Sequence, residues 1–249
     1  MTIVLPDENI APHVEAKVIE KTNLTDVVVR IRLHCKQPFD YLSGQFIHIQ
    51  ADNDASLIRS YSLASQPVAD SFLEIHVSRV PQGKMSNWLH DGLAIGQEIS
   101  ISGPFGDCYY SAGDQQNGLL LLATGTGLAP LWGVLHDALE KRHAGPIHLF
   151  HGGCSLSDLY LVDELRDLAA KHDNFNYSPC LDGAGAETDC DYALLGRVQD
   201  QALKLYPDLK GWQVYLCGNP AMVEEAKRKV FMAGAELGDI HADPFVAVP

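Results

Sequence analysis

The sequence predicts two domains: an antiparallel β-barrel over residues 10–111, followed by an α/β domain with a parallel sheet over residues 118–249. Three observations support this prediction. Apolar residues alternate with period two in the first hundred residues, continuous apolar runs and helical patterns follow, and a polar, glycine-containing stretch at 111–118 separates the two patterns. A chain of 249 residues also has the length of two modest domains.

The N-terminal half contains four alternating segments, which predict strands with one buried and one wet face. Their apolar positions are Val27, Val29, Ile31, Leu33 and Cys35; Ile47 and Ile49; Leu73, Ile75 and Val77; Ile99 and Ile101. Short strands separated by turn-rich pieces indicate a small antiparallel barrel or sandwich. A short helix is expected from Ser86 to His90.

The C-terminal half contains three continuous apolar runs, at Leu119–Ala123, Ile147–Phe150 and Val214–Cys217. Such runs are typical of parallel strands that are buried on both faces by helices. Apolar residues at helical spacing lie between and after them, namely Leu131, Leu135, Ala138 and Leu139; Leu161, Leu165 and Leu168; Met222, Ala226 and Val230. Alternating strands and helices predict βαβ crossovers.

Composition excludes several classes of function. Eighteen basic against 32 acidic residues give a net charge of −14, which disfavours nucleic acids and anionic membrane surfaces as partners. No run approaches the roughly 20 apolar residues of a membrane-spanning helix, and the first ten residues do not resemble a signal peptide. The six cysteines have no metal-ligand spacing, so neither a metal site nor a plant-type iron–sulfur cluster is expected. A cytoplasmic protein with reduced thiols is expected.

Two glycine-bearing turns are candidate phosphate sites. Gly125 and Gly127 follow a buried strand and precede a helix, but Pro130 stands where the dinucleotide fingerprint has Gly or Ala. From spacing alone, a phosphate-binding turn and a plain strand-to-helix turn are equally good interpretations. Gly83-Lys84-Met85-Ser86 does not complete an ATP-type phosphate loop, because position 78 is Ser78. It is either a phosphate-binding turn or the start of a helix capped by Ser86.

Five motifs together resemble the ferredoxin-NADP reductase superfamily of flavoproteins, in the order found there. They are Arg59-Ser-Tyr-Ser62, Gly83-Lys-Met-Ser86, Gly103-Pro-Phe-Gly106, Gly125-Thr-Gly-Leu-Ala-Pro130 and Cys217-Gly-Asn-Pro220. The resemblance covers about residue 14 to Phe245. It implies an N-terminal flavin-binding barrel, a C-terminal nicotinamide-nucleotide domain, and stacking of a nicotinamide ring on a flavin ring.

The resemblance also implies roles for residues of the barrel. Arg59 would pair with a flavin phosphate, Tyr61 would stack on the isoalloxazine, and Ser62 would hydrogen-bond the N5 atom that receives the hydride. The other implied FAD-binding positions are Ser60, the backbone of His76 and Val77, the turn Gly83, Lys84, Met85 and Ser86, and Phe245 near the end of the chain.

In the second domain, the resemblance implies that one turn holds the dinucleotide pyrophosphate through Thr124, Gly125, Thr126 and Gly127. It places a second group beside the nicotinamide, namely Cys217, Gly218, Asn219 and Pro220, and it adds Asp243 as an acidic residue of the reaction centre. Ser62, Cys217 and Asp243 are therefore the expected catalytic residues. The eleven histidines are expected to be ordinary surface or barrel residues.

The expected function is transfer of a hydride from NADH to FAD, with electrons passed to an external acceptor such as a ferredoxin, a flavodoxin or an oxygenase component. NADH is preferred to NADPH because no Lys or Arg occurs between His143 and Leu165 or between His172 and Gly196. These stretches instead contain Asp158, Asp182, Glu187, Asp189 and Asp191. Two alternatives stay open: a reductase of free flavin, and a non-catalytic flavin- or nucleotide-binding subunit.

Overall fold

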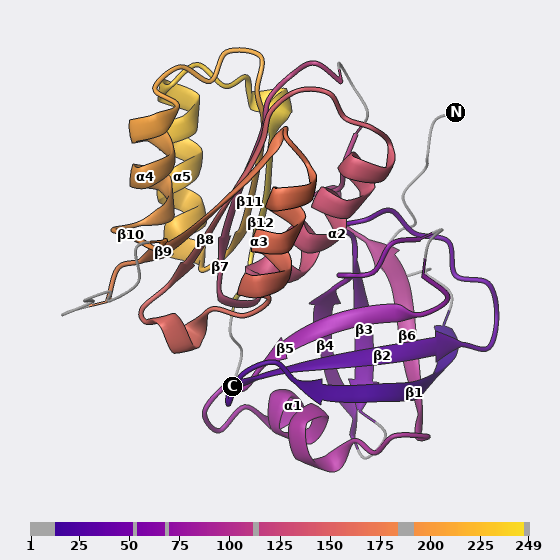
Figure 1. Cartoon of the computed structure of the whole chain (residues 1–249). Helices are drawn as coiled ribbons and strands as arrows, with labels where there is room; N and C mark the ends of the chain where they lie inside the picture. The colour runs from indigo at the N-terminus through magenta and orange to yellow at the C-terminus, as the bar shows by residue number, and fades with distance from the viewer. Residues whose placement is uncertain (1–12, 52–53, 68–69, 112–114, 184–191, 247–249) are drawn as a thin grey trace. The chain divides into compact units, whose positions relative to one another are not determined.

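The computed structural model describes residues 13–51, 54–67, 70–111, 115–183 and 192–246. Contacts divide the chain into two units, which are coloured from indigo to magenta and from magenta to yellow in Figure 1. The first unit extends through Tyr110 and includes Trp132–Asp137, and the second contains Ser111–Leu131 and Ala138–Val246. Five cysteines (Cys35, Cys108, Cys154, Cys180 and Cys217) are free thiols, and Cys190 lies outside the described residues.

The first unit is built on one antiparallel sheet in the order β4-β3-β6-β1-β2-β5. The strands are β1 (His13–Asn23), β2 (Val28–Cys35), β3 (Phe46–Ala51), β4 (Asp54–Ser62), β5 (Leu73–Ser78) and β6 (Glu98–Phe105). An antiparallel bridge between Leu63 and Ile75 joins the two ends of this order. The sheet therefore closes on itself, which decides for a barrel against a sandwich.

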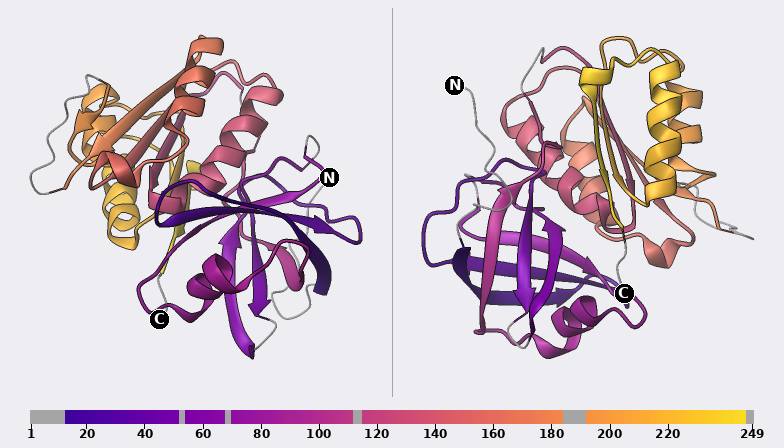
Figure 2. Two further views of the ribbon diagram at one scale, coloured as in Figure 1. Left: turned by 60° about the horizontal axis from the view of Figure 1, so that its bottom comes forward. Right: turned by 180° about the vertical axis from the view of Figure 1, so that it is seen from behind.

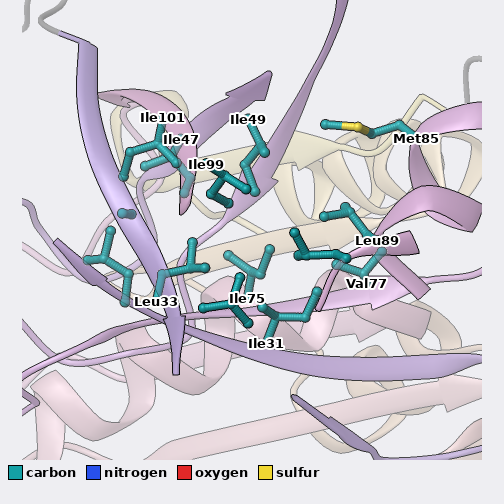
Figure 3. Close-up of a cluster of buried hydrophobic side chains, with 14 of the residues drawn as sticks. Ile31, Leu33, Ile47, Ile49, Ile75, Val77, Met85, Leu89, Ile99 and Ile101 are labelled. Atoms are coloured by element: carbon teal, nitrogen blue, oxygen red, sulfur yellow. The ribbon is translucent and has the colours of Figure 1, made fainter. Parts of the chain in front are cut away.

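The barrel core contains the apolar positions that alternate in the sequence. Ile31, Leu33, Ile47, Ile49, Ile75, Val77, Ile99 and Ile101 point into one cluster (Figure 3). Met85 and Leu89 join this cluster from the helical segment α1 (Lys84–Asn87) and η1 (Trp88–Gly92). The helix after Gly83 is thus held by burial of one apolar face in the barrel.

The capping role considered for Ser86 is wrong. The N-cap of α1 is Gly83, and no side chain caps the helix. The Ser86 hydroxyl instead accepts a hydrogen bond from the Val80 backbone N–H at 3.1 Å, so it stabilises the turn before the helix.

The second unit is a parallel sheet in the order β10-β9-β8-β7-β11-β12. Its strands are β7 (Leu119–Thr124), β8 (Ile147–Gly153), β9 (Phe175–Leu181), β10 (Leu194–Leu195), β11 (Gln213–Gly218) and β12 (Ile240–Pro244). Its helices are α3 (Val162–Lys171), α4 (Val198–Leu205) and α5 (Pro220–Met232), together with the two ends of α2 (Leu128–Glu140), whose middle belongs to the first unit. Short helical turns lie at η2 (Gly125–Gly127), η3 (Leu156–Asp158) and η4 (Leu237–Asp239).

Helices α4 and α5 pack on one face of this sheet, and α3 lies on the opposite face (Figures 1 and 2). Buried residues of the strands, among them Leu120, Leu122, Val214 and Leu216, form a cluster with Ala202 of α4 and with Val223 and Ala226 of α5. Helices on both faces explain why the strands are apolar throughout. None of the helices in the described ranges is long and apolar enough to cross a membrane.

Candidate functional site

The strand order of the second unit reverses between β7 and β11. From β7 the chain adds β8, β9 and β10 on one side, and then β11 and β12 on the other. In open α/β sheets, ligands bind at the carboxyl ends of the strands where the order reverses. The two segments at this point are the Gly125–Gly127 turn after β7 and the Cys217–Pro220 loop, which comprises the last two residues of β11 and the link to α5. They are the two motifs singled out in this half of the sequence.

The two glycines of the first turn serve different purposes. Gly125 is exposed with φ of +53°, and a Cβ atom there would meet nothing within 4 Å. Gly127 is buried against the Cys217–Gly218 peptide, where a Cβ atom would overlap backbone atoms. The turn leads into α2, and neither η2 nor α2 carries an acidic residue in its first turn. Its open side therefore suits an anion at the positive end of a helix.

The Cys217–Pro220 loop is tied to the end of β7. The backbone N–H of Asn219 donates to the Thr124 hydroxyl at 2.9 Å, and a Cβ atom on Gly218, whose φ is +122°, would overlap Thr124. The Asn219 side chain caps α5 by accepting from the N–H groups of Ala221 and Met222, and Pro220 occupies the first turn. The two predicted nucleotide motifs thus form one joined backbone structure.

The last strand brings Asp243 into register with Cys217. Strand β12 pairs with β11 so that Cys217 lies opposite Asp243 and Gly218 opposite Pro244. The Phe245 N–H then donates to the Gly218 carbonyl oxygen at 2.7 Å. Cys217 is fully buried, whereas Asp243 and Phe245 are half-exposed. Two of the three expected catalytic residues therefore lie side by side; the third, Ser62, belongs to the other unit.

Two histidines of β8 correct the expectation that all histidines lie on the surface or in the barrel. The His151 ring is fully buried, edge-on to Tyr160 with ring centroids 5.6 Å apart. In the described part of the chain, neither ring nitrogen makes a hydrogen bond of normal geometry. Burial lowers the pKa of His151 to about 4, although the Gly125 backbone partly offsets this effect. His148 is also buried, between the Tyr206 and Ser178 hydroxyls, and burial lowers its pKa to about 4.

In the barrel, the motif Arg59–Ser62 lies on β4. Residues opposite one another across antiparallel strands share a face, so Arg59 and Tyr61 share the face of their partners Ile49 and Ile47. Tyr61 packs against the barrel core, and burial raises the pKa of its phenol. Ser60 and Ser62 lie on the other face, with the Ser60 hydroxyl 3.0 Å from His48 Nδ1. A ligand that touches all four residues must therefore lie along the edge of β4.

The β5 residues named for backbone contacts have buried side chains. Val77 points into the core, and the His76 ring is buried against Glu74, with Nε2 at 3.0 Å from Oε1. Arg32 pairs with the same carboxylate at 2.6 Å. Burial acts to raise the pKa of Glu74, but the bonds from His76 and Arg32 outweigh it and hold this pKa below its ordinary value. Only the backbone of His76 and Val77 is thus suited to contact a ligand.

The turn at Gly83 likewise offers mainly backbone groups for contact with a ligand. A Cβ atom at Gly83 would come within 2.8 Å of the Ser86 hydroxyl, and Met85 and Ser86 are buried. Lys84 is the exposed side chain of the group. The amides of Lys84, Met85 and Ser86, together with the Lys84 ammonium, are what this turn can present to a phosphate.

Comparison with known proteins agrees with this arrangement. Residues 15–110 match the oxidoreductase FAD-binding domain, and residues 121–228 match the oxidoreductase NAD-binding domain. The ferredoxin–NAD(P)+ reductase component of naphthalene 1,2-dioxygenase/salicylate 5-hydroxylase systems from Ralstonia sp. is 33% identical over 98% of the chain and 74% of its own length. The chain belongs to the ferredoxin-NADP reductase superfamily.

Two further comparisons, one of sequence and one of structure, are with reductases from Amycolatopsis. The reductase subunit of an aromatic O-demethylase is 34% identical over 92% of the chain and 68% of its own length. The crystal structure of a cytochrome P450 reductase superposes with a TM-score of 0.88, at 30% identity, and covers 98% of this chain and 72% of that one. This member of the superfamily is accordingly a flavoprotein reductase that takes electrons from a reduced nicotinamide nucleotide through FAD.

The residues present fit both groups that this superfamily binds. The second unit offers Gly125 with open space on its Cβ side, and the buried His151 of the neighbouring strand β8 lies opposite Ala123, two residues before this glycine. The first unit offers Arg59, the Tyr61 ring and the Gly83 turn. The sequence analysis did not single out His151 or Arg197 as site residues. Arg197 directly follows the stretch between His172 and Gly196 that contains no Lys or Arg. An apolar run interrupted by two histidines, at 148 and 151, was the available signal for His151.

Proposed function

We propose that this superfamily member oxidises NADH, passes the electrons through FAD and delivers them to a protein partner of an oxygenase system. The observation that carries the proposal is the junction of the Gly125 turn with the Cys217–Pro220 loop where the strand order reverses. One loop is suited to the pyrophosphate of a dinucleotide, and the other begins with a buried cysteine beside an acidic residue.

In this proposal the protein binds and orients, and it needs no strong general base. FAD, when bound, supplies a ring that takes up a hydride and releases its electrons singly. Arg59 and the Gly83 turn hold phosphate oxygens, and Tyr61 contacts the ring. Cys217 and Asp243 hold the nicotinamide end, and Ser62 donates a hydrogen bond near the acceptor atom. Holding two reactants in position can lower a barrier by ~7–11 kcal/mol.

The acceptor is proposed from the names of the relatives. The Ralstonia and Amycolatopsis proteins are reductase components of a dioxygenase/hydroxylase system and of an O-demethylase. An oxygenase component, or a ferredoxin that serves one, is therefore the acceptor we propose. The proposed compartment is the cytoplasm, which is reducing enough to keep such cysteines as thiols.

NADH is the proposed substrate in preference to NADPH. The chain after β8 forms a turn in which the Asp158 carboxylate accepts from the Ser155 backbone N–H at 2.8 Å. Asp182 follows β9, and Glu187, Asp189 and Asp191 lie outside the described residues. Acidic groups at this edge would repel a 2′-phosphate and can accept hydrogen bonds from a ribose hydroxyl.

Anaerobic reduction of the purified protein tests the proposal. We expect yellow protein that bleaches with NADH, more slowly with NADPH, and regains its colour when an oxidised ferredoxin is added. Colourless protein that oxidises NADH only with added flavin would instead identify a free-flavin reductase. Yellow protein that neither nucleotide bleaches would identify a non-catalytic binding subunit.

A further inference from the structure

Arg197 lies at the same sheet edge as the proposed dinucleotide site. It is the N-cap residue of α4. The next residue, Val198, packs closely on Gly152: a Cβ atom added to Gly152 would lie 2.8 Å from a methyl group of Val198. Gly152 lies opposite Thr124 at the ends of β8 and β7. Arg197 is therefore at the carboxyl ends of these strands, near the turn that begins at Gly125.

Two carboxylates hold the Arg197 guanidinium. Its Nη1 lies 3.0 Å from Glu225 Oε2, and its Nε lies 3.4 Å from Asp182 Oδ2. Glu225 also binds Lys229 at 2.7 Å, and Lys229 binds Asp200 at 2.5 Å. The hydrogen bond from Lys229, followed by the charges of Lys229 and Arg197, lowers the pKa of Glu225. These five side chains thus form a network of three carboxylates and two cations, with a net charge of −1.

The path of a dinucleotide leads past this network. With the pyrophosphate on the turn after β7, the adenosine ribose lies toward the end of the next strand in the chain, β8. The Asp182 N–H donates to the Gly153 carbonyl oxygen at 3.1 Å, so Asp182 adjoins that end. The 2′ position of the ribose would therefore face the network that contains Arg197. This step rests on the proposed function.

We propose that Arg197 determines specificity between the two nucleotides: its ion pairs with Asp182 and Glu225 prevent its guanidinium from binding a 2′-phosphate. A 2′-phosphate would meet a network whose only cation near Asp182 is already paired, and whose sum is negative. A ribose with a free 2′-hydroxyl has no such conflict. Since the Arg197 side chain is exposed, its ion pairs add little stability, and the guanidinium can turn toward another anion once the carboxylates are removed.

Binding of two nucleotide probes to the full chain with FAD tests this proposal. The probes are 5′-ADP and 2′,5′-ADP, which differ by the 2′-phosphate, and calorimetry measures the affinity of each. The variant Asp182→Asn/Glu225→Gln should bind 2′,5′-ADP about tenfold more tightly relative to 5′-ADP than the unaltered chain does. Asp182→Asn alone, which keeps the Glu225–Lys229 pair, should give a smaller gain in the same direction.

Two control variants isolate the role of Arg197. Adding Arg197→Gln to the double variant should abolish the gain, even though Lys229 still lacks its Glu225 partner there and keeps only Asp200. Glu236→Gln/Asp239→Asn removes the same number of charges beside the start of β12, at the other edge of the sheet, and should give no gain.

Provided that 5′-ADP still binds, either of two results would overturn the assignment of Arg197. One is a gain in relative affinity for 2′,5′-ADP that persists after Arg197→Gln is added, and the other is the same gain in the Glu236/Asp239 control. The assignment would also be overturned if neither the single nor the double variant changed the affinity for 2′,5′-ADP relative to that for 5′-ADP. Failure of the unaltered chain to bind 5′-ADP would overturn the proposed function itself.

Discussion

Gly127 lies against the carbonyl group of Cys217, in the space that any larger residue would need. Because the Asn219 N–H also donates to the Thr124 hydroxyl, the turn after β7 and the loop after β11 are joined at two points. The proposed pyrophosphate and nicotinamide ends of the site are therefore held by one piece of backbone, and their spacing is fixed before a nucleotide binds.

Gly127→Ala should destabilise the protein by about 1–3 kcal/mol, because a methyl group at this position must displace backbone rather than a flexible side chain. The midpoint of urea unfolding measures this loss. Gly238→Ala is the matched control, since a Cβ atom there meets nothing within 4 Å, and it should change stability by less than about 0.5 kcal/mol. Equal stability of the two variants would show that the loops are not in contact.

Arg59→Ala should weaken retention of FAD roughly 10- to 150-fold, which corresponds to loss of a charge-assisted bond worth about 1.5–3 kcal/mol. The ratio of flavin absorbance to protein absorbance after gel filtration measures retention. Arg228→Ala removes an exposed arginine of α5 in the other unit and should leave the ratio unchanged. Unchanged flavin content in Arg59→Ala would remove Arg59 from the site.

Cys217→Ala should slow hydride transfer at least about tenfold while flavin content stays the same, because a small displacement of the nicotinamide is enough to slow the reaction. Anaerobic stopped-flow measurement of flavin bleaching by NADH gives the rate. Cys180→Ala truncates another buried cysteine of the same sheet, in β9, and should keep the rate of the unaltered protein. If both variants bleach at that rate, Cys217 is a packing residue.

Stability should fall as the pH decreases from about 6.5 to about 4. His148 and His151 are buried as neutral rings with pKa values of about 4, against 6.5 for an exposed histidine, so the unfolded chain binds protons that the folded chain does not. Each histidine then contributes roughly 3 kcal/mol at pH 7 that is lost by pH 4.

Urea unfolding at pH 7 and pH 4.5 measures this dependence. His151→Gln should make stability less sensitive to pH, whereas His34→Gln, which changes an exposed ring, should leave the dependence as it is. A pH profile that is the same in both variants would argue against a buried, neutral His151.

Much of the fold follows from the sequence pattern because burial imposes it. Val29, Ile31 and Leu33 alternate since one face of β2 meets the core, and Leu119–Ala123 is continuous since β7 is covered on both faces. Strand β1 was missed because its alternation, which includes the small Ala16, is broken by a register shift between Val18 and Glu20. Strand β9 was missed because it contains Pro179, which a central strand rarely accepts.

The candidate site was predictable as a set of motifs but not as a set of side-chain directions. Order along the chain singled out Arg59–Ser62, Gly125–Gly127 and Cys217–Pro220 as candidates. It could not indicate that the Met85 and Val77 side chains point into the barrel core, because that depends on strands far away in the sequence. It also could not pair Arg197 with Glu225, which α5 brings to the end of α4.

Strand β12 is the last part of the second unit to leave the ribosome. Until it emerges, β11 is an edge strand whose unpaired backbone groups can bind to other chains. The pairing of Cys217 with Asp243 is thus formed only once residues 240–244 have been translated. Nascent chains stalled before residue 240 should consequently be prone to aggregation, because they expose the unpaired edge of β11.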